Sequence, residues 1–222
     1  MSSLVFPAGI PQTVAETQEL SETQTPHIIL GKVISEREST DFPKISLSYV
    51  QSAGADPNLI FPAPLVHKNF AICMQGKIEN PELIPLAPAF AKRAPNNTDA
   101  ERLFQYIIQL TAGLKTPQSI RRAIVKAMMH VRTQSKYTVA NIVFSNGRFL
   151  WGIREINQSN PLVKIQKLFG RFSMFYGTDA DLKTKLIASQ NILMPGIRWE
   201  KLANHSLLEI DTKTGRVQTM KF

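Results

Sequence analysis

The side chains that could perform chemistry are few in this 222-residue chain. The only cysteine, Cys73, lies inside the apolar stretch 69–74, so we expect a buried core thiol, no disulfide and no multi-cysteine metal site. The chain has four histidines, which are His27, His67, His130 and His205. Their spacing matches no metal-ligand pattern, and no Ser-His-Asp arrangement is readable. We therefore expect neither a metal nor a cofactor.

Short stretches rich in β-branched and aromatic residues predict the strands that must position any site. The predicted strands are 2–10, 27–35, 45–51, 69–74, 138–144, 148–153, 172–176, 184–188, 206–211 and 216–221. The dipeptide Asn146-Gly147 favours a type I′ hairpin turn, and Lys213-Thr214-Gly215 turns the last hairpin. The polar segment 11–26 is typical of an exposed loop. This segment is rich in Thr, Gln and Glu and ends at Pro26.

Between the strand-rich halves lie two segments with clear helix signals. Thr98-Asp99-Ala100-Glu101 is a capping box, and Thr116 followed by Pro117 is typical of a second helix start. Each helix carries an apolar stripe, which is Leu103, Ile107, Leu110 and Leu114 in the first and Ile120, Ile124, Ala127 and Val131 in the second. Because strands, two helices and strands follow one another without alternating, we expect an α+β layered sandwich rather than a doubly wound parallel sheet.

The connection from 81 to 97 is rich in proline. Pro81, Pro85, Pro88 and Pro95, with Pro64 before them, predict a rigid irregular segment between the last early strand and the first helix.

Two motifs in this order carry a resemblance to a known family. The segment Asn69 to Asn80, NFAICMQGKIEN, resembles a strand and turn of the class II glutamine amidotransferases. In that family the segment consists of apolar residues followed by His-Asn-Gly and then x-Ile-Glu-Asn. Met74, Gln75 and Gly76 stand at the His-Asn-Gly positions. Thr98 to Glu101 is similar to the family's Thr-Asp-Ser/Thr-Glu helix start, at close to the family's separation.

Segments of the C-terminal half are also similar to the family in their order. They are 173–177, 187–192, Trp199 and 206–211. The resemblance covers about residues 45 to 222. It implies a single domain, 1–222, with the αββα four-layer sandwich of N-terminal-nucleophile hydrolases, in which helices flank two facing antiparallel sheets.

The resemblance implies an oxyanion hole and a substrate clamp. Gln75 and Gly76 would form the oxyanion hole, although Gln75 is one methylene longer than the family's Asn. Tyr49 stands where the family has the Arg that grips the substrate carboxylate, and a phenol is no bidentate clamp. Asp99 matches the acid that binds the substrate amine, but an acid in a first helical turn also interacts favourably with the helix dipole. Equally, Gln75-Gly76 reads as a simple strand-ending turn.

The nucleophile position implied by the family is the residue after the initiator Met, where the freed α-amine acts as base. Ser2 occupies it, and its hydroxyl could serve if Met1 were removed. With Met1 attached, the Ser2 nitrogen is an amide and cannot act as a base. We therefore expect a pseudoenzyme that binds a partner protein or a small amide or amino-acid ligand. The alternative is an active amidohydrolase that uses Ser2 on an amide other than free glutamine.

The charge of the chain suggests one further alternative. The net charge is +9, and residues 113–222 carry 18 Lys/Arg against 6 Asp/Glu, whereas residues 1–112 carry 8 against 11. A basic half can attract nucleic acid or an acidic partner. The run lacks a nucleic-acid motif, so we expect no specific nucleic-acid binding. Because the N-terminus carries no basic-then-apolar signal and no long apolar stretch occurs, we expect a cytoplasmic protein without membrane contact.

Overall fold

The structure is a computed structural model. It describes the backbone of residues 2–5, 27–34 and 44–51. Residues 64–161, 163–164, 172–179, 184–189 and 196–222 are described with their side chains, Thr184 excepted. The predicted loop 11–26 and the second half of the predicted strand 2–10 lie outside these ranges.

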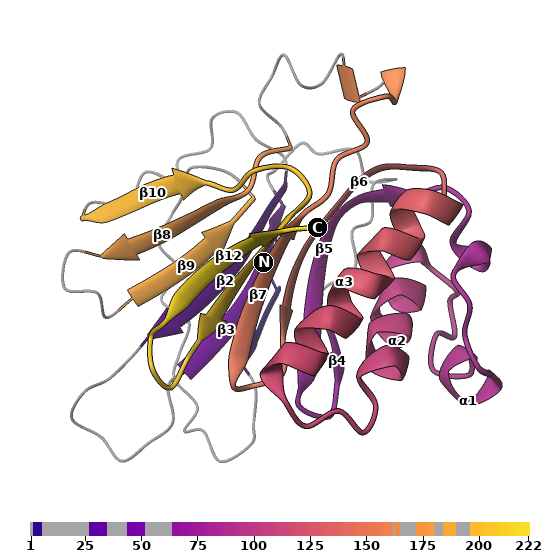
Figure 1. The fold of residues 1–222 in the computed structure, drawn as a ribbon, viewed down its shortest axis with the longest axis horizontal. Helices are drawn as coiled ribbons and strands as arrows, with labels where there is room; N and C mark the ends of the chain where they lie inside the picture. Colours follow the sequence, from indigo (N-terminus) through magenta and orange to yellow (C-terminus); the bar gives the residue numbers. More distant parts are fainter. Residues whose placement is uncertain are drawn as a thin grey trace.

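The described strands form two antiparallel sheets (Figure 1). The first sheet has the order β1-β3-β2-β9-β8-β10, with bounds β1 Ser2–Val5, β2 His27–Ile34, β3 Lys44–Gln51, β8 Phe175–Asp179, β9 Thr184–Ala188 and β10 Ile197–Lys201. The second has the order β12-β11-β7-β6-β5-β4, with bounds β4 Leu65–His67, β5 Phe70–Ile78, β6 Tyr137–Ser145, β7 Phe149–Arg154, β11 Ser206–Asp211 and β12 Val217–Lys221. Every pairing within them is antiparallel.

Helices α2 (Asp99–Thr111) and α3 (Pro117–Gln134) pack on the outer face of the second sheet (Figure 1). The predicted capping box begins α2, because Thr98 Oγ1 accepts the Glu101 N–H at 3.2 Å and Glu101 Oε2 accepts the Thr98 N–H at 3.2 Å. The predicted stripes are buried except at the end of the first one, where Leu110 is partly buried and Leu114 is exposed. Leu114 is 37% exposed because α2 ends at Thr111, before the stripe reaches it.

A second apolar layer lies between the two sheets. It contains Cys73, Val143, Leu150 and Leu208 from the second sheet and Ile187 from the first. The sheets approach closely at Gly152 of β7, where a Cβ atom would lie 2.8 Å from Ile187 Cγ2. The prediction of a mixed α/β protein with two facing antiparallel sheets and helices on one outer face is therefore confirmed.

The proline-rich connection is irregular as predicted, apart from the short turns η1 (Pro81–Leu83) and α1 (Pro88–Ala91). Besides the backbone hydrogen bonds within these turns, side chains of α2 bond to the connection. Arg102 donates to the carbonyls of Pro81 and Ile84, both at 2.6 Å, and Gln109 Oε1 accepts the Ala87 N–H at 2.7 Å. These bonds join the connection to α2.

The hairpin prediction at Asn146-Gly147 was wrong in its turn type. A type I′ turn needs positive φ at both central residues, and of these two only Gly147 has one, at +86°. Asn146 Oδ1 instead accepts the N–H groups of Arg148 and Phe149 at 3.1 and 2.8 Å. This side-chain turn holds Asn146 outside the left-handed region, and the loop between β6 and β7 has three residues.

The strand predicted at 172–176 begins later, at Phe175, and continues to Asp179. The reason is β10, which the sequence reading did not predict. Trp199 of β10 pairs with Gly177, where a Cβ atom would lie 2.9 Å from the Trp199 ring. Gly177 thus extends the strand by leaving room for the indole. No helix in the described ranges has the length and apolar character needed to cross a bilayer.

Candidate functional site

The first strand places the candidate nucleophile beside the candidate clamp. β1 begins at Ser2, and Ser2 is directly opposite Tyr49 in the antiparallel pairing of β1 with β3. Tyr49 is in turn opposite Ile29 of β2. Met1 and the side chains of these three residues lie outside the description. At the level of the backbone, two of the predicted site residues are therefore neighbours.

The candidate oxyanion residues lie on the other sheet, near the end of β5, a strand that contacts both β2 and β3. Gln75 shares a strand face with Cys73 and so is directed between the sheets. It is 6% exposed, and its Oε1 accepts a hydrogen bond from Asn141 Nδ2 at 3.1 Å. Asn141 is wholly buried, and its Oδ1 accepts the Glu155 N–H at 3.1 Å. The Gln75 carboxamide is thus part of a buried structural pair.

Gly76 has a structural reason to be glycine. It lies at a bulge between β5 and β6, with φ at +119°, which side-chain-bearing residues rarely adopt. A Cβ atom at this position would lie 1.9 Å from the carbonyl oxygen of Val139. Any larger residue would have to displace the backbone of β6.

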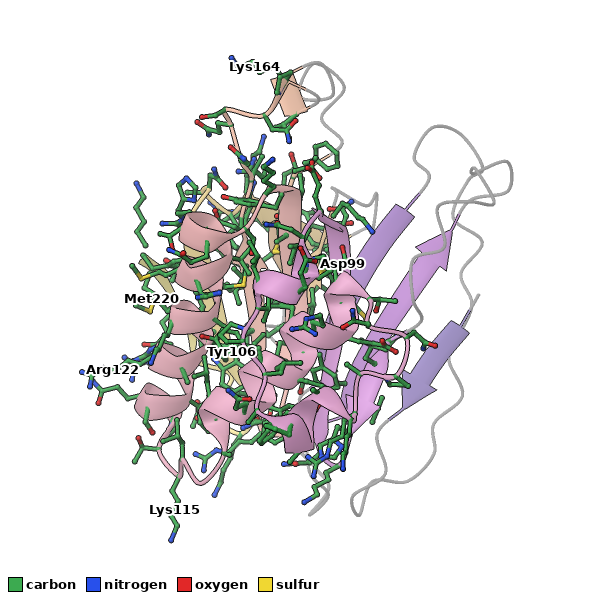
Figure 2. The ribbon with its side chains drawn as sticks, turned by 90° about the vertical axis from the view of Figure 1, so that its right-hand side faces the viewer. Asp99, Tyr106, Lys115, Arg122, Lys164 and Met220 are labelled. Carbon is green, nitrogen blue, oxygen red and sulfur yellow. The ribbon has the colours of Figure 1, made fainter. Side chains whose placement is uncertain are left out.

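Asp99 also has a structural role, because its carboxylate accepts two backbone hydrogen bonds. Its Oδ2 accepts the Ile78 N–H at 2.9 Å, and its Oδ1 accepts the Ala100 N–H at 3.0 Å. The first contact joins the start of α2 to the end of β5, two residues after Gly76. Figure 2 shows Asp99 where α2 begins, beside the strands. The structure therefore brings Gln75, Gly76 and Asp99 together at one end of β5.

Cys73 is a core thiol, as predicted. It is 2% exposed, and burial raises the pKa of its thiol to about 12. Because the reactive species of cysteine is the thiolate, the native thiol has almost none available at neutral pH.

We therefore expect Cys73 to resist dithionitrobenzoate in the folded protein and to react at once in denaturant. The raised pKa also means that the stability contributed by the neutral thiol is present below the unfolded pKa and is lost as pH rises toward 12. Absorbance at neutral pH, with and without urea, measures the reaction. Rapid modification of native protein would contradict the buried placement.

The sequence reading missed a buried carboxylate, Glu155, which follows β7 and is wholly inaccessible. Arg132 of α3 donates to both of its oxygens, from Nη2 at 2.6 Å and Nε at 3.2 Å, and the Tyr137 hydroxyl donates to Oε1 at 2.6 Å. The Nδ1 atom of His205 lies 3.1 Å from Oε1. The hydrogen bond to Glu155 raises the pKa of Arg132, and burial followed by the same carboxylate raises the pKa of Tyr137.

This Glu155 cluster is a structural centre rather than an open site, because both carboxylate oxygens are occupied by partners from α3, from β6 and from His205, which precedes β11. The signal available in the sequence was weak. Glu155 continues the strand alternation two residues after the buried Ile153, which marks a position directed at the core. Within the described part of the chain, no group of three His, Cys, Asp or Glu side chains could hold a metal ion.

Comparison by sequence finds no matching family model and no matching curated relative. Solved structures do match in fold. A glutamine aminotransferase class-II domain protein from Silicibacter pomeroyi is 14% identical with a TM-score of 0.56, and the match covers 88% of this chain and 98% of that one.

A second match is the glutamine phosphoribosylpyrophosphate amidotransferase from B. subtilis, solved with ADP and GMP. It is 11% identical with a TM-score of 0.50, over 87% of this chain and 42% of that one. Identities this low speak for the fold alone. They agree with the resemblance carried by the motifs at 69–80 and 98–101: the chain has the fold of a class II glutamine amidotransferase domain.

Proposed function

We propose that this protein is a class II glutamine amidotransferase-like domain that lacks glutaminase activity and binds a small amide or amino-acid ligand, or a partner protein, at the former active site. One observation carries the proposal. The two site residues of the family pattern that the chain retains, Gly76 and Asp99, are both needed by the scaffold. The steric requirement at Gly76 and the Asp99 bond to Ile78 account for them without any catalytic role.

The departures from the pattern fall on residues whose family role is chemical. Ser2 replaces the thiol, Tyr49 replaces the guanidinium clamp, and Gln75 replaces the oxyanion asparagine. A serine hydroxyl is hardly ionised near neutral pH, so it depends wholly on a well-placed base. Gln75 is one methylene longer than asparagine, which displaces its N–H donor, and its carboxamide is oriented by the bond that Oε1 accepts from Asn141. Each replacement weakens a different part of the same reaction, and together they support a binding role.

The four-layer αββα arrangement belongs to this proposal, and burial in the first sheet supports it. Leu186 and Ala188 of β9 alternate with Ile187, which faces the second sheet, so they are directed to the opposite, outer face. Both are wholly buried. An apolar outer face that excludes water requires a covering layer, as the four-layer sandwich has on that side.

The test is ammonia release from L-glutamine, followed by coupling to glutamate dehydrogenase. We expect the unmodified protein to match buffer. The triple variant Ser2→Cys, Tyr49→Arg, Gln75→Asn should gain activity once Met1 is removed, whereas single reversions should do little, because residues that act as a unit are not additive. One oxyanion donor alone is worth about 10²–10³ in rate.

Folding must be checked in the same series, because Gln75→Asn also gives up the bond to Asn141, at a cost of about 1 kcal/mol. The single Gln75→Asn variant is the matched control for that loss. Glutaminase activity of the unmodified protein would overturn the proposal.

A second candidate is an amidohydrolase that uses Ser2 on another amide, and the pairing of Ser2 with Tyr49 at the start of β1 favours it. This mechanism requires a free Ser2 amine, so intact-mass measurement must show the loss of Met1. Turnover of chromogenic anilides that Ser2→Ala abolishes would establish it in place of the first candidate.

A further inference from the structure

β12 is the last strand of the second sheet. Among the described strands it pairs with β11 alone. The Phe222 N–H donates to His205 O at 3.0 Å and the Asp211 N–H donates to Arg216 O at 3.0 Å. Because hydrogen-bonded and non-hydrogen-bonded pairs alternate along an antiparallel ladder, the even-numbered residues 216 to 222 bond to β11. Val217, Thr219 and Lys221 therefore direct their N–H and C=O groups away from the sheet.

Helix α3 runs beside this strand and is joined to it at two levels. Arg121 pairs with Glu209 at 3.0 Å, and Glu209 also accepts a hydrogen bond from the Gln218 amide. Eleven residues further along α3, Arg132 donates to Phe222 O at 3.0 Å. The helix from Arg121 to Arg132, about 16 Å long, therefore lies alongside the strand from Gln218 to Phe222, about 13 Å long, and the two run in the same direction.

Two exposed methionines lie between these joints. Met129 of α3 is 47% exposed and Met220 of β12 is 37% exposed. Met220 is opposite Leu207, which packs under the helices, so its side chain is on the α3 side of the strand. Figure 2 shows Met220 beside α3, on the same side as Arg122. Flexible, polarisable methionine side chains suit contact with varied apolar partners.

The surface around the methionines is positively charged. Arg122 and Lys126 on α3, Arg216 just before β12 and Lys221 on β12 are all exposed. Arg216 shares the α3 face of the strand with Met220, whereas Lys221 is directed to the opposite face. The acids nearby are already engaged, since Glu209 is buried against Arg121 and Asp211 lies 3.7 Å from Arg148. In the ranges that the structure describes, none of the four cations has a carboxylate within ion-pair distance. A second copy of this chain would bring the same cations to the same edge, where like charges repel.

We propose that the β12 edge and the adjoining surface of α3 form a docking site for an extended, acidic segment of a partner protein. The segment adds to the sheet as a strand beside β12, through the outward backbone groups of Thr219 and Lys221. Side chains on the α3 face of the added strand contact Met129 and Met220 and lie near Arg122, Lys126 and Arg216, and acidic side chains on its other face lie near Lys221. The site is separate from Gln75 and Asp99, so it stands whether or not the protein hydrolyses an amide.

The probe is a fluorescein-labelled peptide of alternating glutamate and valine, about nine residues long, titrated with the full chain and followed by fluorescence anisotropy. Thr219→Pro removes one outward N–H and should weaken binding roughly 5- to 10-fold. Thr219→Ala keeps that N–H and should bind within about twofold of the unmodified protein. Equal thermal unfolding of the two variants excludes general misfolding.

Charge reversal provides an independent arm. Lys126→Glu with Lys221→Glu should weaken binding roughly tenfold at low salt and less at high salt, because the charges are exposed and screened. Lys164→Glu makes the same change at an exposed position distant from this edge and should have no effect (Figure 2).

Absence of peptide binding, or equal binding by all variants, would overturn the proposal. So would a chain that dimerises in sedimentation through this edge, with the dimer lost in Thr219→Pro. Tighter binding of polyuridylate than of the peptide, weakened by the same charge reversals, would assign the surface to RNA instead.

Discussion

Gly76→Ala is expected to prevent folding or to lower the free energy of unfolding by more than about 4 kcal/mol. The added Cβ atom would lie 1.9 Å from Val139 O and 2.4 Å from Val139 C. Both are backbone atoms of a neighbouring buried strand, so relief requires separating β5 from β6 near the end of β5. Since whole domains are stable by only about 5–15 kcal/mol, a loss of this size removes much of the native population.

Urea unfolding followed by circular dichroism measures the effect, and Gly113→Ala is the matched control. Gly113 also has a positive φ, +76°, but no atom lies within 4 Å of its added Cβ. It should lose only about 1 kcal/mol, the cost of placing alanine in that backbone region. Equal losses at the two glycines would mean that the bulge relaxes around a side chain and that Gly76 is not required by packing.

Glu155→Gln is expected to lower the free energy of unfolding by about 3 kcal/mol. The change preserves shape but removes the charge, and breaking a buried ion pair from one side costs about 3–5 kcal/mol because the partner is left uncompensated. Arg132 is 26% exposed and so regains some hydration, which favours the lower end of that range. The Tyr137 hydroxyl keeps an acceptor in the glutamine oxygen.

The matched control is Glu79→Gln, the same substitution at an exposed position, which should change stability by no more than about 0.5 kcal/mol. A double-mutant cycle with Arg132→Met isolates the pair, and we expect a coupling energy above about 1 kcal/mol. A coupling energy near zero would show that the contribution of Arg132 to the free energy of unfolding does not depend on Glu155.

The local parts of the fold were predictable because their signals are local. The capping box at Thr98 and the Thr116-Pro117 pair mark where α2 and α3 begin, and the apolar stripes lie within the helices themselves. All these signals come from residues of the same short segment. The apolar stretch around Cys73 likewise predicted its burial. Errors arose where a distant residue decides the outcome: β8 extends past Gly177 because Trp199 of β10 packs on it.

The sequence motifs singled out Gln75, Gly76 and Asp99 but did not predict the contacts of these residues. The structure places all three near the end of β5, and their role in a site stays a prediction. The motifs could not reveal that Val139 lies against Gly76 or that Ile78 donates to Asp99, because these contacts depend on the sheet register. The Glu155 cluster was missed for the same reason, since its partners lie 23, 18 and 50 residues away in the sequence.

The dependence of the 81–97 connection on α2 has a consequence for synthesis. Arg102 and Gln109 bond to the segment that precedes them, and both come from a helix that leaves the ribosome later. During translation the local turns of the connection can therefore form before its contacts with α2 exist. The attachment of the connection to the helix follows the synthesis of α2, although domains as a whole generally fold with the N-terminal part first.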